Sequence, residues 1–329
     1  MFYRLTGNVF IQGDPKRRAV LPWCEPQRSA RGADPLIDVH LVPFFQGSGK
    51  AADVQKLTAD SILAAAGHRE ARIQLVSATL ESERAAVPEG FRAERLLSRT
   101  VLDLHAFRTP RPLPLLFDVL ELGASAGGRH YLCLSNADIC VQPHFYAAVG
   151  TLLRRGFDCL IVNRRSVGGI EQYGSHGACA AVEVGKAHPG ADCFIFPASW
   201  LGSLVRSDAC VGAGFVMRSL IYNLVGRAEA LLILEDASLT YHYGDDAPWS
   251  QGRYADYTEH NRQQAARVFS QLLESDGGAA AKLREFARVF NHRDVLDLRS
   301  RRRRWWSPLR RSPPGQPPGE PRRRSGNSP

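Results

Sequence analysis

The pattern of apolar and polar residues divides most of the chain into alternating strands and helices. The first clear unit joins an apolar run over 36–43, helical apolar spacing over 51–66, and a second apolar run over 72–79. Two strand-like runs joined by a helix form the repeating unit of a parallel sheet, with a right-handed crossover in nearly all cases. The sequence therefore predicts that this unit begins a layered α/β domain.

The alternation of strands and helices continues to about residue 273. Further strands are predicted over 100–105, 130–140, 158–163, 192–196 and 231–243. Further helices are predicted over 115–122, 143–155, 213–228 and 254–273. The stretch 166–189 is rich in Gly, Ala and Ser without a clear period, which predicts a flexible loop or insertion. Together these elements predict a single doubly wound, Rossmann-like α/β domain. Its mostly parallel central sheet is flanked by helices and binds ligands at the carboxyl ends of the strands.

Charge changes this picture at one end of the chain only. Ten arginines and a single acid, Glu320, fall within 299–329, so this tail carries the whole net charge of +9. Residues 1–298 are formally neutral, which disfavours nucleic acid as a partner of the folded part. The Pro, Gly, Arg and Ser content of the tail cannot build a core and predicts disorder. Its run 301–306, four arginines and two tryptophans, suits an anionic membrane surface, while RNA binding or simple disorder fits the same composition.

The cysteines and the N-terminal segment indicate the compartment. Seven cysteines are dispersed without a CxxC pair, and five of them lie in apolar runs: Cys133, Cys140, Cys159, Cys193 and Cys210. Cysteines in such runs behave as small buried hydrophobes, which argues against a disulfide scaffold or a zinc site. Residues 1–15 lack the apolar core of a signal peptide, and no apolar run is long enough to span a membrane. We therefore expect a cytoplasmic protein whose membrane contact, through the tail, is peripheral and on the inner face.

The strand over 130–140 ends in the residues with the clearest chemistry. A carboxylate at the carboxyl end of a parallel strand points into the crevice where ligands bind, so Asp138 is a candidate ligand for Mg²⁺ or Mn²⁺. Asn136 points to the same side of the chain and offers a carbonyl oxygen or a hydrogen bond to a ribose. A structural alternative is that Asp138 caps the helix that begins near Pro143.

A histidine late in the chain is the second candidate metal ligand. His242 lies in an aromatic strand and is followed by Gly244 and the acid pair Asp245 and Asp246. A neutral imidazole can complete a metal shell that is otherwise made of oxygens, and nearby carboxylates tune it. The structural alternative is a buried, hydrogen-bonded histidine followed by two aspartates of a turn.

Three acids are candidates for a general base. Glu235 and Asp236 lie just upstream of the His242 motif, and Asp192 starts a predicted strand after the turn at 188–191. The base that deprotonates a hydroxyl is commonly a carboxylate whose pKa is raised by partial burial. Each acid also has a structural interpretation, as a solvated side chain or as the hydrogen-bonding residue of a turn.

Two further segments predict contacts to a nucleotide. Arg164 ends a strand and offers its planar fork to diphosphate oxygens, and at most one of Arg164 and Arg165 can do so because neighbours in a strand face opposite ways. Phe45 and Gln46 follow the first strand in a loop that could touch a nucleotide. This loop is not a P-loop, because GSGKAAD lacks the GxxxxGK[ST] spacing and has Ala51 where a hydroxyl is required.

The order of these motifs resembles that of GT-A-type glycosyltransferases. A first strand ending in VPFF precedes an Asn-x-Asp that closes the middle strand, and a histidine follows on a late strand. The stretches YLCLSNADICVQPHFY, VNRR, HPGADCFIF and LTYHYGDD are similar to those of uncharacterised bacterial members of that fold. The resemblance covers roughly residues 36–275.

The resemblance implies how the chain is organised. A nucleotide-sugar donor would bind to the half 36–139, and a glycan, lipid or protein acceptor to the half 140–275. An N-terminal extension, 1–35, precedes this domain. A helical segment, 276–298, follows it and leads into the tail.

The resemblance also implies roles for single residues. The Asp-x-Asp metal motif of the family falls on Asn136–Asp138, its metal-binding histidine on His242, and its acidic base on Asp192, Glu235 or Asp236. Ser77 joins Phe45, Gln46, Asn136 and Arg164 as the expected contacts to the donor.

The implied activity is hexosyl-type transfer that depends on Mn²⁺ or Mg²⁺. Asn136 departs from the family pattern and removes one charge from the metal motif. Two alternatives stay open at this point, a sugar-nucleotide pyrophosphorylase and a non-catalytic nucleotide-sugar-binding protein of the same fold.

Overall fold

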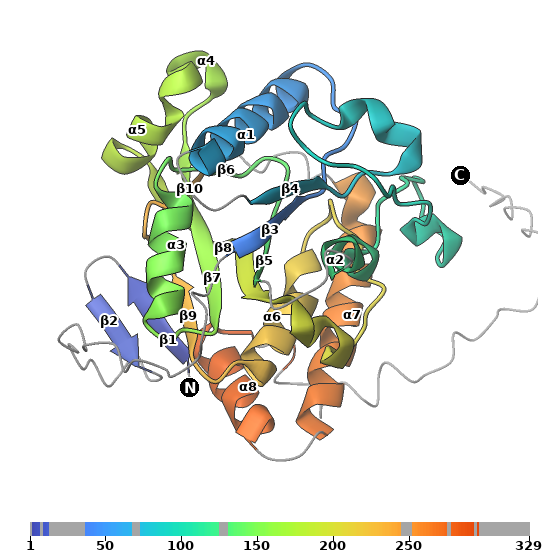
Figure 1. The fold of residues 1–329 in the computed structure, drawn as a ribbon. Helices are drawn as coiled ribbons and strands as arrows, with labels where there is room; N and C mark the ends of the chain where they lie inside the picture. Colours follow the sequence, from blue (N-terminus) through green and yellow to red (C-terminus); the bar gives the residue numbers. More distant parts are fainter. Residues whose placement is uncertain are drawn as a thin grey trace, which may run out of the picture.

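The chain folds around one central sheet with helices on both sides, so the predicted α/β class is confirmed (Figure 1). The computed structural model describes residues 2–6, 9–12, 37–67, 73–124, 131–244, 252–274, 278–292 and 295. The tail, predicted to be disordered and to offer a membrane contact, lies outside the described residues, as do Asp245 and Asp246. No helix in the described ranges is long and apolar enough to cross a membrane.

The sheet contains ten strands among the described residues. They are β1 Phe2–Thr6, β2 Val9–Gln12, β3 Ile37–Val42, β4 Gln74–Ser77, β5 Tyr131–Ser135, β6 Cys140–Val141, β7 Cys159–Val167, β8 Lys186–Pro197, β9 Leu231–Leu234 and β10 Thr240–Tyr243. The main path runs β2-β1-β9-β7-β8-β5-β3-β4, and β10 pairs with β6 and β7. Pairings β1–β9, β9–β7, β7–β10, β5–β3 and β3–β4 are parallel. Strand β8 runs antiparallel to both of its neighbours, β5 and β7, in the middle of the sheet.

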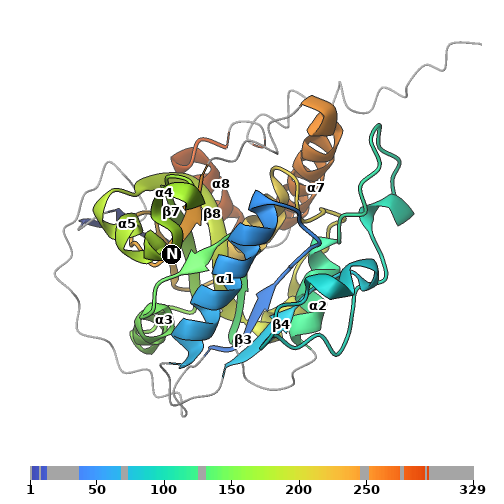
Figure 2. The ribbon, with the colours of Figure 1, turned by 90° about the horizontal axis from the view of Figure 1, so that it is seen from above.

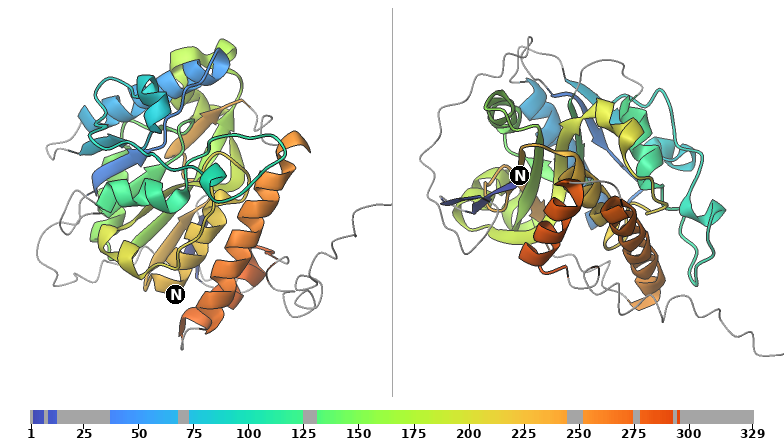
Figure 3. Two further views of the ribbon diagram at one scale, coloured as in Figure 1. Left: turned by 90° about the vertical axis from the view of Figure 1, so that its right-hand side faces the viewer. Right: turned by 90° about the horizontal axis from the view of Figure 1, so that it is seen from below.

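The helices connect these strands and cover both faces of the sheet. The longer ones are α1 Lys50–Gly67, α2 Leu116–Ala124, α3 Phe145–Arg154, α6 Val216–Arg227, α7 Ala255–Glu274 and α8 Gly278–Val289. Two short helices, α4 Ile170–Tyr173 and α5 Gly177–Glu183, lie between β7 and β8. Figure 2 looks down on α1, and Figure 3 shows α7 and α8 together on one side of the molecule.

Side chains along each central strand point alternately to the two faces of the sheet, and this alternation explains the two hydrophobic layers of the core. In β5, Leu132 and Leu134 join the core formed with α2, α6, α7 and α8, whereas Cys133 joins the core formed with α1 and α3. The same alternation occurs in β7, β8 and β9. Because successive side chains of a strand point to opposite faces, strands covered by helices on both faces are apolar throughout. The five cysteines predicted to be buried are buried free thiols.

Three predicted elements are corrected by the structure. Residues 100–105 form no strand: Thr100 caps the 3-10 helix η2 (Val101–Asp103) in a capping box with Asp103. The stretch 166–189 is not a structureless loop, because it contains the end of β7, the helices α4 and α5, and the start of β8. The predicted strand 231–243 is two strands, β9 and β10, which occupy different places in the sheet.

A buried histidine in β3 gives the fold a pH dependence. His40 is fully buried; its Nδ1 lies 2.7 Å from the Tyr146 hydroxyl and its Nε2 lies 2.8 Å from the Ser135 hydroxyl. Burial lowers the pKa of His40 to about 3. The imidazole is therefore neutral in the folded protein, whereas in the unfolded chain it takes up a proton below about pH 6.5.

We expect acidification to destabilise the fold through His40. Because the unfolded state binds more protons between the two pKa values, the free energy of unfolding falls as the pH drops below about 6.5. Between about pH 7.5 and about pH 5 the loss from this one residue is about 2 kcal/mol. Urea unfolding at both pH values measures it. The variant His40→Gln, which cannot titrate, should show about 2 kcal/mol less pH dependence, and parallel curves for the two proteins would contradict the prediction.

Candidate functional site

A cavity of about 650 Å³ lies at the carboxyl ends of β3, β4 and β5. The segments after these strands line it, at 43–46, at 78–83 in part, and at 136–138. Residues of β7 and β8 complete the same wall, among them Arg164 and Asp192. The carboxyl edge of parallel strands is where α/β sheets bind ligands, so this cavity is the candidate site.

Asp138 and His242 meet at this edge. Their atoms Oδ2 and Nε2 lie 3.3 Å apart, with the aspartate side chain 39% exposed and the histidine side chain 7% exposed. They meet because β6 pairs with β10 in a register that sets Cys140 opposite Tyr241. Asp138 does not cap α3, whose N-cap is His144, so the structural alternative for this aspartate is not what the fold uses.

The pair formed by Asp138 and His242 fits a hard divalent cation. Adjacent ligands of an octahedral Mg²⁺ at about 2.1 Å lie about 3 Å apart, close to the separation of Asp138 and His242. His242 Nδ1 is buried and has no hydrogen-bond partner in the part of the chain that the structure describes. Within those ranges no group of three or more His, Cys, Asp or Glu residues could hold a metal. The described residues therefore bring two possible ligands together, and in sites with so few protein ligands substrate phosphates and water supply the rest.

Asp192 lies at the centre of a buried polar group on the cavity wall. Its Oδ2 lies 2.7 Å from Arg164 Nη1, and its Oδ1 accepts a hydrogen bond of 3.4 Å from the Asn136 amide. Burial raises the pKa of Asp192, and the positive charge of Arg164 opposes that rise. The negative charge of Asp138 raises the same pKa further.

Arg164 reaches the cavity whereas Arg165 does not. The β7–β8 register shifts on both sides of Asn163, and such bulges re-aim side chains beside functional sites. Arg165 instead lies 2.7 Å from Asp236 and donates a hydrogen bond to the Gly185 carbonyl. The sequence-based rule that at most one of the two arginines faces the ligand therefore agrees with the geometry.

Four of the predicted site residues are not part of the cavity lining, and one of them, His242, reaches it only through its contact with Asp138. Ser77 is fully buried and its hydroxyl lies 2.5 Å from that of Thr79. Asp236 is paired with Arg165, and Glu235 follows β9 without lining the cavity. Among the three candidate bases, Asp192 is the one that lines it.

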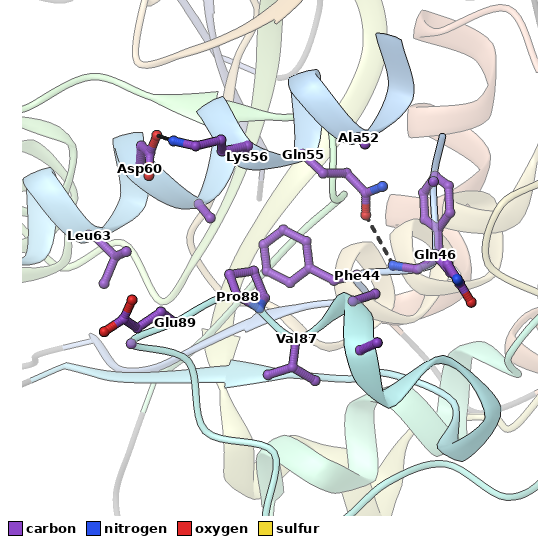
Figure 4. Close-up of a pocket in the computed structure, with 16 residues that line it drawn as sticks. Phe44, Gln46, Ala52, Gln55, Lys56, Asp60, Leu63, Val87, Pro88 and Glu89 are labelled. Carbon is purple, nitrogen blue, oxygen red and sulfur yellow. Dashed lines mark hydrogen bonds and ion pairs between the residues drawn. The ribbon is translucent and has the colours of Figure 1, made fainter. Parts of the chain in front are cut away.

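Phe45 and Gln46 are held on the cavity wall by α1. The Phe45 backbone N–H donates a hydrogen bond of 3.0 Å to the Gln55 side chain. A second cavity of about 670 Å³ lies between α1 and the segment 85–90, on the same Phe45 and Gln46 loop (Figure 4). Its acids are Asp60, which is paired with Lys56, and Glu89, so it lacks the polar group that surrounds Asp192. The 650 Å³ cavity is therefore the candidate site.

Sequence reasoning missed several polar residues of the cavity lining. They are Glu83, Arg111, His188, Arg218 and His292. Burial raises the pKa of Glu83, and the backbone of Gln46 and the charge of Arg111 oppose the rise. His188 accepts a hydrogen bond of 2.9 Å from the Gly190 N–H at its Nδ1. No strand-end motif marks these residues: His188 lies near the start of β8, and the other four come from loops and helix ends around the sheet.

No protein-family model and no curated protein sequence matches the chain. Solved structures do match. Residues 1–349 of S. aureus TarS match with a TM-score of 0.46 at 10% identity, covering 84% of this chain and 76% of that one. The mannosyltransferase PcManGT from Pyrobaculum calidifontis, in complex with GDP-Man and Mn²⁺, matches with a TM-score of 0.46 at 13% identity over 84% and 73%.

A third match is glucosyl-3-phosphoglycerate synthase from Mycobacterium tuberculosis, in complex with Mn²⁺, UDP-glucose and phosphoglyceric acid. Its TM-score is 0.40 at 15% identity, over 74% of this chain and 82% of that one.

Proposed function

We propose that this chain transfers a sugar from a nucleotide-diphosphate donor to an acceptor hydroxyl in the 650 Å³ cavity. One observation carries the proposal: Asn136, Asp138 and Arg164 line the same cavity as Phe45 and Gln46. A ring for a base, an amide for a ribose, a guanidinium fork for phosphates and a carboxylate for a cation are the groups that a nucleotide-sugar needs.

Each residue has a task in this proposal. Phe45 and Gln46 bind the nucleoside, and Arg164 pairs with oxygens of the diphosphate. Asp138 and His242 hold Mn²⁺ or Mg²⁺, which when bound supplies positive charge to the leaving diphosphate. Asp192 accepts the proton of the acceptor hydroxyl. Its burial raises its pKa and makes it a stronger base than an exposed aspartate.

We expect the protein to be stabilised by one nucleotide class together with a divalent cation. A ligand that binds only the folded state adds about 2.7 kcal/mol at a hundred times its Kd, which raises the melting temperature by about 5 °C in a domain of this size. A thermal-shift screen of UDP-, GDP-, ADP-, CMP- and dTDP-sugars, each with and without Mn²⁺, measures this. The nucleotide that requires Mn²⁺ for its shift then names the donor class.

Other outcomes point to other functions. Formation of a nucleotide-sugar from a nucleoside triphosphate and a sugar phosphate would favour a pyrophosphorylase. A shift without turnover on any acceptor would favour a non-catalytic binding protein, for which the uncharged Asn136 is the supporting feature. No shift with any donor, in a protein that melts cooperatively, would contradict all three.

A further inference from the structure

One part of the cavity lining comes from outside the sheet and is rich in cationic groups. It is formed by the segment 111–114, the segment 211–218 at the start of α6, and His292 after α8. Arg111 and Arg218 bring guanidinium groups to it from distant parts of the chain. Among the acids that line the cavity, Asp138 lies beside His242 and Asp192 beside Arg164, and Glu83 lies within the field of Arg111.

Arg111 is held in place by α7. Its backbone N–H donates a hydrogen bond of 2.7 Å to the Tyr257 hydroxyl, and the Phe107 ring stacks on the Tyr257 ring with centroids 3.8 Å apart. Its guanidinium group lies over the Tyr254 ring, 4.9 Å from the centroid. A guanidinium stacked on a ring keeps its in-plane N–H groups directed outward, the geometry that suits a planar bidentate contact to an anion.

Arg218 is held in the same way at the start of α6. Its guanidinium group lies 4.3 Å from the centroid of the Phe215 ring. Phe215, the N-cap of α6, has φ 64°, in the left-handed region that side chains rarely adopt. The start of α6 lines the cavity, and the dipole at a helix start favours negative charge. The Arg218 N–H of this first turn donates a hydrogen bond of 3.1 Å to the Phe215 carbonyl.

His292 adds a third nitrogen-bearing group to the cavity lining. Its Nδ1 lies 3.1 Å from the Tyr222 hydroxyl. Tyr222 follows Arg218 by four residues on α6, and residues at this spacing lie on one face of a helix. Two arginines and an imidazole, from three separate segments, therefore line the same cavity.

We infer that the acceptor carries an anionic group, a phosphate or a carboxylate, which binds to Arg111, Arg218 and the start of α6. That the anion belongs to the acceptor rests on the proposed function, whereas the anion site itself is inferred from the residues. We expect the donor diphosphate to bind elsewhere in the cavity than at this anion site. Its proposed contacts, Arg164, Asn136 and Asp138, lie on the wall formed by the sheet. An anion held by α6 leaves the remainder of the acceptor to reach Asp192 within the same cavity.

Titration with inorganic phosphate tests the anion site directly. The full-length protein is titrated by calorimetry at constant ionic strength, with acetate in a parallel titration to separate phosphate from carboxylate. Arg218→Gln should weaken binding of the preferred anion about tenfold or more, because a hydrogen bond to a charged group is lost. Arg111→Gln should weaken it in the same way. Arg206→Gln is the matched control, because Arg206 is an exposed arginine paired with Glu121 that does not line the cavity.

Two further readouts keep the result interpretable. Thermal melting checks that each variant folds, and Arg218→Lys keeps the charge without the fork, so partial recovery of anion binding is expected. The Kd for a nucleotide-sugar with Mn²⁺, measured on the same proteins, should stay within about twofold of the original while anion binding falls. A twofold change in Kd is smaller than the loss of one hydrogen bond to a charged group would cause.

The outcomes separate the anion site from the proposed function. Unchanged phosphate and acetate binding in both arginine variants, or no anion binding by the unaltered protein, would overturn the inference. An equal loss of anion and nucleotide-sugar binding would also overturn it, because the arginines would then serve the donor. Anion binding that depends on Arg218, in a protein that binds no nucleotide-sugar, would support the site and contradict the transferase.

Discussion

Replacing Asp138 by alanine is expected to lower the proposed sugar transfer by about 1000-fold, because the cation proposed to neutralise the leaving diphosphate would lose its carboxylate ligand. That factor corresponds to about 4 kcal/mol of transition-state stabilisation, within the several kcal/mol that a bound cation supplies. The free energy of unfolding should change by less than about 1 kcal/mol, because the side chain is 39% exposed and half-exposed ion pairs contribute little. Initial rates with Mn²⁺, Mn²⁺ binding by electron paramagnetic resonance, and urea unfolding measure the three quantities.

The matched control for Asp138 is Asp60→Ala. Asp60 is an aspartate of α1 with a 53% exposed side chain, and it is paired with Lys56 outside the 650 Å³ cavity. Its replacement should leave transfer and Mn²⁺ binding unchanged. Transfer at the original rate by the Asp138→Ala variant in metal-depleted buffer would remove the cation from the proposal.

The layered core could be predicted from the sequence because its signal is local. Runs such as YLCLS alternate between two buried faces, and such runs are apolar in every position. The predictions for β3, α1 and β4 were confirmed with shifts of one or two residues at their ends, and so was their parallel pairing. Direction within the sheet has no such local signal. The sequence predicted a strand at 192–196, but its antiparallel run between β5 and β7 follows from the whole topology.

The segment 166–189 was predicted wrongly because its longer helix, α5, is built mostly from small residues. Ala180 and Ala181 of α5 pack against Tyr241 and Tyr243 of β10. A Cβ atom on Gly177 would lie 1.9 Å from the Tyr243 hydroxyl, so the helix needs a glycine where it meets the strand. The aromatic residues that stabilise α5 lie about 60 residues away in the chain, and composition read within 166–189 cannot reveal them.

The sequence predicted the site residues that lie on or just after the central strands. It did not predict those whose position depends on the order of strands in the sheet or on the course of a loop. Asn136 and Asp138 follow β5, Arg164 lies within β7, and all three line the cavity. Glu235 and Asp236 also follow a strand, β9, but that strand lies beside β7 and β1 and its acids do not line the cavity. Glu83, Arg111 and Arg218 belong to loops and helix ends, whose positions depend on contacts across the whole fold.

The structure also gives a physical reason for Asn136 in place of an acid. Its amide nitrogen donates a hydrogen bond to Asp192. The negative charge of Asp138 already raises the pKa of Asp192. An aspartate at 136 would bring a third carboxylate against Asp192, and like charges at that distance disfavour ionisation of both groups. The amide therefore adds no third negative charge beside Asp192, and it leaves the proposed cation site with one carboxylate fewer.

Replacing Asp192 by alanine is expected to lower the free energy of unfolding by about 3–5 kcal/mol, because it leaves the guanidinium of Arg164 buried without its carboxylate. The two side chains are 6% and 11% exposed, and their charged atoms lie 2.7 Å apart. Transfer should be lost as well, because the proposed base is gone. Urea unfolding gives the stability change. Glu121→Ala is the matched control, since it breaks the exposed Arg206–Glu121 pair and should cost less than about 1 kcal/mol.

The double variant Arg164→Met with Asp192→Leu tests whether the buried ion pair is needed for stability or for activity. Replacing a buried ion pair by apolar side chains of similar size is commonly neutral or stabilising, so the double variant should unfold within about 1 kcal/mol of the original protein or above it. Transfer should nevertheless stay abolished, because neither the base nor the phosphate-binding fork is restored. Recovery of stability without activity would mean that the ion pair is needed for transfer and not for folding. The free energy that its burial costs would then be offset by the rest of the core. A double variant as unstable as Asp192→Ala would mean that the pair, with Asn136 beside it, is needed to hold β7, β8 and the end of β5 in register.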